Sequence, residues 1–167
     1  MTISANNYIL NDVIAGKKLL RMAYEILENN LNEKEIILAG IRESGSVVAR
    51  NIQKLLAGLS PLKTEMITIS LDKKHPNDVV INKSINFNDK VIIVIDDVAN
   101  SGRTLLYALK PFLAFHPKKI QTLVLIDRTH KAFPIKPDYV GISIATTLLE
   151  HIYVEVDNEK VLGAYLK

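Results

Sequence analysis

The chain has 167 residues, 48% of them hydrophobic and 23% charged, which is the composition of a soluble globular protein with one substantial core. The absence of cysteine excludes disulfides, thiolate metal ligands and cysteine nucleophiles, and fits a cytoplasmic location. A formal net charge of +3 suits anionic ligands but does not by itself indicate a nucleic-acid-binding protein. We therefore expect a single domain over residues 1–167. No membrane span or signal peptide is expected, because no apolar run approaches the roughly 20 residues required and MTISANNYIL lacks a basic start.

The N-terminal third predicts a helix, a buried strand and a second helix. Asn11 is typical of a helix N-cap, and Asn29-Asn30 of a helix end. The apolar residues predicted to share the buried face of this helix are Val13, Leu20, Ala23, Leu27 and Leu31. Glu35–Ile41 (EIILAGI) predicts a central strand that runs into the loop Arg42–Gly45. Helical spacing then resumes, and we expect this second helix to end at Gly58.

The next segment combines one strand with a charged, turn-rich stretch. Thr64–Leu71 (TEMITISL) alternates and predicts a strand, and Asp72–Asp78 follows it. Val79–Ile81 and Ile85–Phe87 have the composition of a short hairpin. We interpret residues 64–90 as a hood or flexible-loop region over a site, with a solvated excursion as the alternative.

The centre of the chain predicts a strand, a loop with glycine and a helix. Val91–Ile95 is an apolar, β-branched run typical of a strand buried on both faces. Asp96-Asp97 follows it, and a helix begins at about Gly102 and ends or kinks at Pro111. Further strands are predicted at Ile120–Ile126, Tyr139–Ile144 and Ile152–Val156. This order predicts an α/β fold with a mainly parallel central sheet flanked by helices.

Three polar segments follow predicted parallel strands and should meet at one edge of the sheet: Arg42–Gly45, Asp96–Thr104 and Asp127–His130. A glycine-bearing loop before a helix offers backbone N–H groups to an anion such as phosphate. The carboxylates of Asp96 and Asp97 add acceptors for sugar hydroxyls or for a metal ion. Together these features indicate a site for a phosphorylated sugar.

Three other sites with a similar strand–loop–helix arrangement fit less well. A phospho-receiver domain needs a phosphate-accepting aspartate, and no acid ends the strand Glu35–Ile41. Ser101-Gly102-Arg103-Thr104 lacks the first glycine and the lysine of a nucleoside-triphosphate loop. The chain also has no G-x-G-x-x-G sequence for a dinucleotide.

Residues 91–104 closely resemble the phosphoribosyl-diphosphate-binding motif of type I phosphoribosyltransferases. Residues 127–141 (DRTHKAFPIKPDYVG) resemble one subfamily, the bifunctional pyrimidine operon attenuation regulator/uracil phosphoribosyltransferase. The similarity runs from about Tyr8 to Val156. It implies a homodimeric enzyme that transfers ribose 5-phosphate from phosphoribosyl diphosphate to a pyrimidine base, uracil above all, and forms UMP and diphosphate in pyrimidine salvage.

The resemblance also implies roles for individual residues. Asp96 and Asp97 would hold the ribose 2′- and 3′-hydroxyls, directly or through Mg²⁺, the implied cofactor. We group Arg128 with these two acids as catalytic, and Lys73, Lys74 and Arg128 are the candidates for neutralising diphosphate. The residues implied to wrap the 5′-phosphate are Val98, Ala99, Asn100, Ser101, Gly102, Arg103 and Thr104. Those implied to hold diphosphate are Arg42, Glu43, Ser44 and Gly45, with a non-proline cis peptide bond near Glu43-Ser44.

Two departures from the family bear on the substrate. Asn100 stands where the hypoxanthine/guanine enzymes have an acid near the purine, which favours a pyrimidine. Glu43-Ser44-Gly45 replaces the Thr-Arg-Gly that is usual in the uracil regulators, so a cation is missing from the diphosphate loop. Two alternatives to a uracil enzyme therefore stay open. One is a nucleotide-sensing regulator that binds RNA without turnover, and the other is a phosphoribosyltransferase for another base.

An RNA-binding face of the regulator type would use four basic residues: Arg21, His130, Lys131 and Lys136. However, Leu20, Tyr24 and Ile142 stand at positions where that face is polar or basic. For these four basic residues we favour a solvated surface over an RNA interface.

Overall fold

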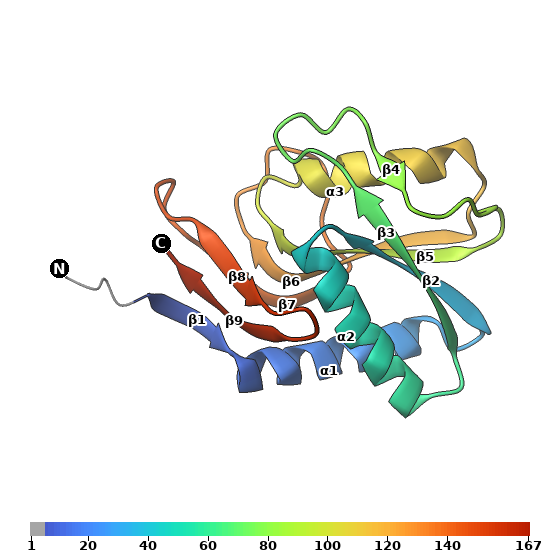
Figure 1. Ribbon diagram of the computed structural model, residues 1–167, viewed down its shortest axis with the longest axis horizontal. Helices are drawn as coiled ribbons and strands as arrows, with labels where there is room; N and C mark the ends of the chain where they lie inside the picture. Colours follow the sequence, from blue (N-terminus) through green and yellow to red (C-terminus); the bar gives the residue numbers. More distant parts are fainter. Residues whose placement is uncertain (1–5) are drawn as a thin grey trace.

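The computed structural model describes residues 6–167 and shows a six-stranded sheet of order β4-β3-β2-β5-β6-β7 (Figure 1). All neighbouring pairs are parallel except β4 and β3, which are antiparallel. The strands are β2 Glu35–Ile41, β3 Lys63–Ser70, β4 Val80–Ile81, β5 Val91–Ala99, β6 Lys119–Arg128 and β7 Tyr139–Ile144. The predicted α/β fold with a mainly parallel sheet is confirmed.

Helices cover both faces of this sheet because its central strands are apolar on both sides. α1 (Asp12–Asn29) and α2 (Ser44–Leu59) pack on one face, while α3 (Arg103–Ala108) and the 3₁₀ helix η1 (Lys110–Ala114) pack on the other. The prediction that α2 ends at Gly58 was wrong by one residue, since the helix continues to Leu59.

A second, three-stranded antiparallel sheet of order β1-β9-β8 lies beside the helices (Figure 1). It consists of β1 Asn7–Asn11, β8 Ile152–Val156 and β9 Val161–Leu166. Its inner face joins the core of α1 and α2 through Leu10, Val161 and Ala164. Only β8 was predicted from the sequence, because β1 (NYILN) is mixed in composition and β9 (VLGAYL) is interrupted by Gly163.

The predicted ends of α1 are confirmed, but its predicted buried face was wrong. Asn11 caps the helix by accepting a hydrogen bond from the Ile14 N–H at 2.9 Å, and Asn29 is the last helical residue. The buried side chains are Ala15, Leu19, Met22, Ala23 and Ile26. Of the predicted set only Ala23 is buried, whereas Val13, Leu20 and Leu31 are exposed. The helix carries two apolar stripes, and the tertiary structure buries the stripe that contains Leu19 and Met22 instead of the predicted one.

The segment after β3 is irregular and packs against the sheet at two points. β4 pairs with Ile69 and Ser70 of β3, and the predicted hairpin partner, Ile85–Phe87, forms no strand. Instead Phe87 is buried, with its ring edge-on to Phe112 at 4.9 Å between centroids. The hairpin prediction was therefore wrong, because each half finds its partner elsewhere in the fold.

The structure also bears on the expectations about membranes and leader segments. Across residues 6–167, no helix is both long and apolar enough to cross a membrane. We expect no signal peptide in the N-terminal stretch MTISANNYIL. Its first five residues lie outside the described part of the chain.

Candidate functional site

The three polar segments predicted to share a sheet edge are brought together by adjacent parallel strands. β2, β5 and β6 are neighbours, so the segments that follow their carboxyl ends converge. Gly45 lies directly against β5: a Cβ atom placed on it would be 2.7 Å from the carbonyl oxygen of Ile95 and 3.1 Å from Asp96 Oδ1. The loop implied to hold diphosphate therefore touches the acidic pair.

Asp96 and Asp97 belong to the strand rather than following it, because β5 continues to pair with β6 as far as Ala99. The prediction that the strand ends at Ile95 was wrong for this reason. Asp96 is buried and accepts a hydrogen bond from the Asp97 N–H at 2.9 Å. Burial, followed by the charge of Asp97, raises the pKa of the Asp96 carboxyl well above its usual range. The site thus holds a buried acid whose charge needs a nearby cation.

Lys73 supplies that cation from the segment that follows β3. Its Nζ lies 3.3 Å from Asp96 Oδ1 and 3.8 Å from Asp97 Oδ1. Burial alone would lower the pKa of the Lys73 ammonium, but the charges of the two aspartates outweigh this and the pKa is raised. Arg103, from the loop that follows β5, donates to the Lys73 carbonyl at 3.1 Å. No sequence signal separates Lys73 from its neighbour Lys74, whose side chain is exposed.

The loop implied to wrap the 5′-phosphate encloses a small cavity of about 60 Å³, which is large enough for a small anion. Its lining is Lys73, Val98, Ala99, Asn100, Ser101, Gly102, Arg103, Thr104 and Leu105. Gly102 has a φ of 86° and would place a Cβ atom 2.6 Å from Ile135 Cγ2, so this position requires glycine. The Ser101 carbonyl accepts hydrogen bonds from the N–H groups of Ala132 and Phe133, which fixes the loop against the 130–137 segment.

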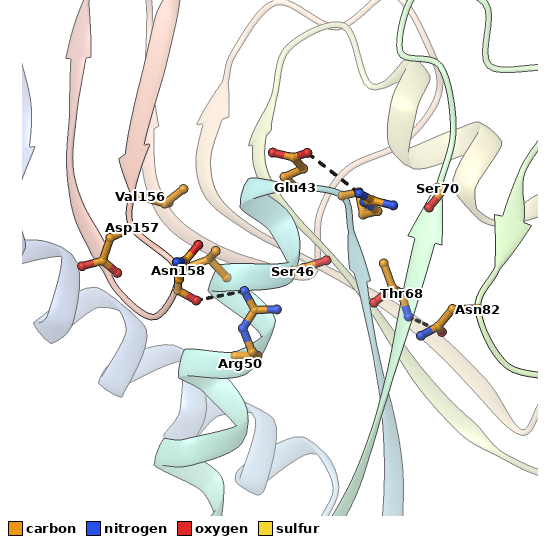
Figure 2. Close-up of a pocket in the computed structure, with 11 residues that line it drawn as sticks. Glu43, Ser46, Arg50, Thr68, Ser70, Asn82, Val156, Asp157 and Asn158 are labelled. Carbon is orange, nitrogen blue, oxygen red and sulfur yellow. Dashed lines mark hydrogen bonds and ion pairs between the residues drawn. The ribbon is translucent and has the colours of Figure 1, made fainter.

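The loop at Arg42–Gly45 borders a larger groove of about 640 Å³ (Figure 2). A non-proline cis peptide bond joins Arg42 to Glu43, one residue before the position implied by the family resemblance. Figure 2 shows the groove between two walls around α2, one of Thr68, Ser70 and Asn82 and the other of Val156, Asp157 and Asn158. The Arg42 and Glu43 side chains are both exposed and lie 4.0 Å apart. A carboxylate thus stands beside the only arginine of this loop.

Arg128 and Lys131 lie at the same edge but are already bonded to the chain. Arg128 donates to the Thr147 carbonyl, and its Nε is buried without a hydrogen-bond partner in the described residues. Lys131 donates to the Asp127 carboxylate and, at 3.4 Å, to the Ala99 carbonyl. Both side chains therefore hold the loops around the site in place.

The four basic residues considered for RNA binding differ in their surroundings. Arg21 donates to the carbonyls of Val140 and Gly141 and forms an ion pair with Glu25. Lys131 is engaged as described above, whereas His130 and Lys136 are exposed. The structure therefore does not gather the four into one free basic face.

Residues 7–159 match the family model described as the phosphoribosyl transferase domain. The chain belongs to the phosphoribosyltransferase family. Two relatives of this phosphoribosyltransferase are proteins called Bifunctional protein PyrR. The one from Streptococcus suis (strain 05ZYH33) is 33% identical over 159 residues, covering 90% of this chain and 92% of the relative. The one from Streptococcus pneumoniae (strain CGSP14) is 32% identical over 164 residues, covering 92% and 94%.

Solved structures with the same fold include two purine phosphoribosyltransferases. The hypoxanthine phosphoribosyltransferase of Trypanosoma cruzi superposes with a TM-score of 0.80 at 13% identity, covering 97% of this chain and 96% of that one. A hypoxanthine-guanine phosphoribosyltransferase of Bacillus anthracis gives 0.74 at 21% identity, covering 87% and 86%. At these identities the likeness supports the fold of this phosphoribosyltransferase and carries no statement about its base.

Proposed function

We propose that this phosphoribosyltransferase transfers ribose 5-phosphate from phosphoribosyl diphosphate to a ring nitrogen of uracil, forming UMP and diphosphate. The observation that carries the proposal is the contact of three elements at one sheet edge. The acidic pair, of which Asp96 is buried, adjoins the Gly45 turn on one side and the small cavity of the 98–105 loop on the other. This matches a substrate whose ribose carries diphosphate at one end and the 5′-phosphate at the other. We further propose a cytoplasmic, homodimeric protein, as the family resemblance implies.

The reaction breaks the bond between ribose C1 and the diphosphate oxygen, and forms a bond between C1 and the base nitrogen. Positive charge builds on the ribose as the leaving group takes the bonding electrons. Asp96 and Asp97 would orient the ribose hydroxyls and stabilise this charge, because their carboxylates are already fixed by backbone hydrogen bonds. The 98–104 loop would hold the 5′-phosphate through backbone N–H groups and the hydroxyls of Ser101 and Thr104.

The acidic pair also fits Mg²⁺ bound together with the substrate. Lys73 Nζ, 3.3 Å and 3.4 Å from the two Asp96 oxygens, marks a place where a cation is stabilised. Within residues 6–167 no group of three or more His, Cys, Asp or Glu side chains is arranged to bind a metal. Magnesium commonly binds one or two carboxylates and takes its other ligands from substrate oxygens and water. When bound, it would neutralise charge on the departing diphosphate.

Three observations bear on the choice of base and on the alternative function. Asn100, an exposed amide in the phosphate loop, cannot act as the acid expected beside a purine, which favours a pyrimidine. The name of the relatives, Bifunctional protein PyrR, is consistent with a second, regulatory role. Glu43 in the diphosphate loop favours the second candidate, a nucleotide-sensing regulator with little turnover, because its carboxylate repels diphosphate.

The decisive experiment measures diphosphate release from phosphoribosyl diphosphate and Mg²⁺ with uracil, hypoxanthine, guanine, adenine, orotate or no base. We expect release that depends on uracil. Release with another base alone would refute the uracil assignment but keep the reaction. Binding of phosphoribosyl diphosphate without release for any base would refute the enzyme and support the sensor.

Glu43→Gln should lower the KM for phosphoribosyl diphosphate several-fold, because it removes a negative charge from the diphosphate loop. The effect is kept modest by solvent screening, since the Glu43 side chain is 86% exposed. Initial rates at varied phosphoribosyl diphosphate and low ionic strength would measure it. Glu28→Gln on α1 is the matched control and should leave KM unchanged, and an unchanged KM for Glu43→Gln would place diphosphate away from this side chain.

A further inference from the structure

Lys73 occupies the position at the acidic pair where the proposed function requires a cation. Its Nζ lies 3.3 Å and 3.4 Å from the two carboxylate oxygens of Asp96 and 3.8 Å from Asp97 Oδ1. Among the basic side chains of residues 6–167, no other forms an ion pair with either aspartate. The protein therefore fills the cation position of its acidic pair with a cation of its own.

Lys73 reaches the acidic pair from the solvent side of the site. Its side chain is 48% exposed, whereas the side chain of Asp96 is 1% exposed. The two partners thus differ, because the carboxylate belongs to the core and the ammonium group does not. A lysine has a long, flexible stem, so Lys73 can leave the pair without any unpacking of the core.

The segment that carries Lys73 is attached to the rest of the molecule by hydrogen bonds at the surface. Figure 1 shows the chain between β3 and β4 running past α3. Arg103 and Lys110 each donate at 3.1 Å, the first to the Lys73 carbonyl and the second to the Asn77 carbonyl, and both bonds are exposed. Five of the six residues 72–77 are exposed as well. A segment held in this way opens more readily than one held by the core, so loss of the lysine contact is able to free it.

A divalent cation and the Lys73 ammonium group exclude one another at this pair. A cation such as Mg²⁺ binds carboxylate oxygens directly and requires an ordered shell of further oxygen ligands. An ammonium group 3.3 Å from the same oxygen takes the space of those ligands and repels the cation. Lys73 therefore lowers the affinity of the free protein for a divalent cation. A cation that arrives with the oxygen atoms of a phosphorylated sugar brings the additional interactions that can replace the lysine.

We propose that Lys73 blocks the acidic pair in the free protein and leaves it when a divalent cation binds there, which also frees residues 72–77 from the site. The free site is thus closed by the protein's own side chain and opens as it is loaded. The identity of the substrate that brings the cation rests on the proposed function. The competition itself follows from the contacts of Lys73 with Asp96 and Asp97.

Mn²⁺ binding tests the competition, because Mn²⁺ takes the same oxygen ligands as Mg²⁺ and electron paramagnetic resonance measures the free ion. Lys73→Met keeps the apolar stem and removes the charge, and we expect it to bind Mn²⁺ about tenfold more tightly than the wild type. Lys74→Met is the matched control, since it removes the charge of the exposed neighbour, and it should keep the wild-type affinity. Adding Asp97→Asn to Lys73→Met should cancel the gain, which would locate the metal at the acidic pair.

Two outcomes of this titration overturn the proposal. One is an Mn²⁺ affinity of Lys73→Met that is equal to or below that of the wild type, with circular dichroism confirming that the variant is folded. The other is the absence of Mn²⁺ binding in both proteins, because the acidic pair would then not be a cation site. Binding by Lys73→Met with none by the wild type would be the expected competition in its strongest form.

Amide hydrogen exchange tests the release of residues 72–77. In the absence of metal, these amides should exchange several-fold faster in Lys73→Met than in the wild type and in Lys74→Met. In the wild-type protein they should exchange faster as Mn²⁺ fills the site. Unchanged exchange in both comparisons would overturn the release, and slower exchange with Mn²⁺ would show that the segment closes over the cation instead.

These readouts need neither a base nor turnover, so they separate this inference from the proposed function. Tighter Mn²⁺ binding by Lys73→Met, together with no base-dependent diphosphate release by the wild type, would keep the inference and refute the function. Diphosphate release by the wild type, together with an unchanged Mn²⁺ affinity of Lys73→Met, would keep the function and refute the inference.

Discussion

The double variant Asp96→Asn/Asp97→Asn should lose base-dependent diphosphate release by on the order of 1,000-fold in kcat/KM. In the proposed reaction the two carboxylates would face the ribose, where positive charge develops. Asparagine keeps their size and some of their hydrogen bonds, including acceptance of the Asp97 N–H by residue 96, but removes both charges. Initial rates with saturating Mg²⁺ and the active base would measure the loss.

A measurement of folding stability is the control that distinguishes lost catalysis from lost folding. Because burial raises the pKa of Asp96, the charged carboxyl costs stability at neutral pH, and Asp96→Asn removes that cost. We therefore expect Asp96→Asn to unfold at a denaturant midpoint equal to or above that of the wild type at pH 7. The advantage should shrink as the pH falls below the raised pKa, and it should disappear only below the ordinary carboxyl pKa, where the side chain is protonated in both the folded and the unfolded protein.

Asp89→Asn serves as the matched charge control for activity, because Asp89 precedes β5 and lies at the opposite end of the strand from Asp96. It should leave kcat/KM unchanged. Turnover of the Asp96→Asn/Asp97→Asn variant within about tenfold of the wild type would mean that the reaction does not use these carboxylates.

Gly45→Ala should both destabilise the protein and reduce its activity. The added methyl group would lie 2.7 Å from the Ile95 carbonyl oxygen and 3.0 Å from the Cα of Asp96, and both of these are backbone atoms of the central strand. The start of α2 must then move away from the acidic pair, at a cost of about 1–3 kcal/mol. Urea unfolding measures the destabilisation, and kcat/KM measures the displacement of the diphosphate loop.

Gly58→Ala is the matched control, because Gly58 lies near the end of the same helix with no atom within 4 Å of the added methyl group. It should stabilise the protein by up to about 1 kcal/mol, since alanine is the better helix former, and leave activity unchanged. Equal unfolding midpoints for Gly45→Ala and Gly58→Ala would contradict the close approach of α2 to β5.

The amino-acid sequence by itself determined the elements whose signal is local. The strands Glu35–Ile41 and Tyr139–Ile144 were predicted with the bounds that the structure has, the first because it is a nearly continuous buried apolar run and the second because its buried and more exposed residues largely alternate. The sequence likewise predicted a helix that begins at about Gly102, and α3 begins at Arg103 after Gly102, whose φ of 86° favours glycine. The convergence of the polar loops followed from strand order, which parallel topology restricts to few possibilities.

Only the tertiary structure decided which partners these elements take. The sequence of α1 contains two apolar stripes of similar period, and contact with the sheet selects the one with Leu19 and Met22. Lys73 and Lys74 are equivalent in sequence, yet only Lys73 forms ion pairs with Asp96 and Asp97. Likewise, Lys131 binds Asp127 instead of remaining a free surface charge. In each case the deciding contact joins side chains whose pairing depends on the packing of the whole chain, which the local spacing of residues does not specify.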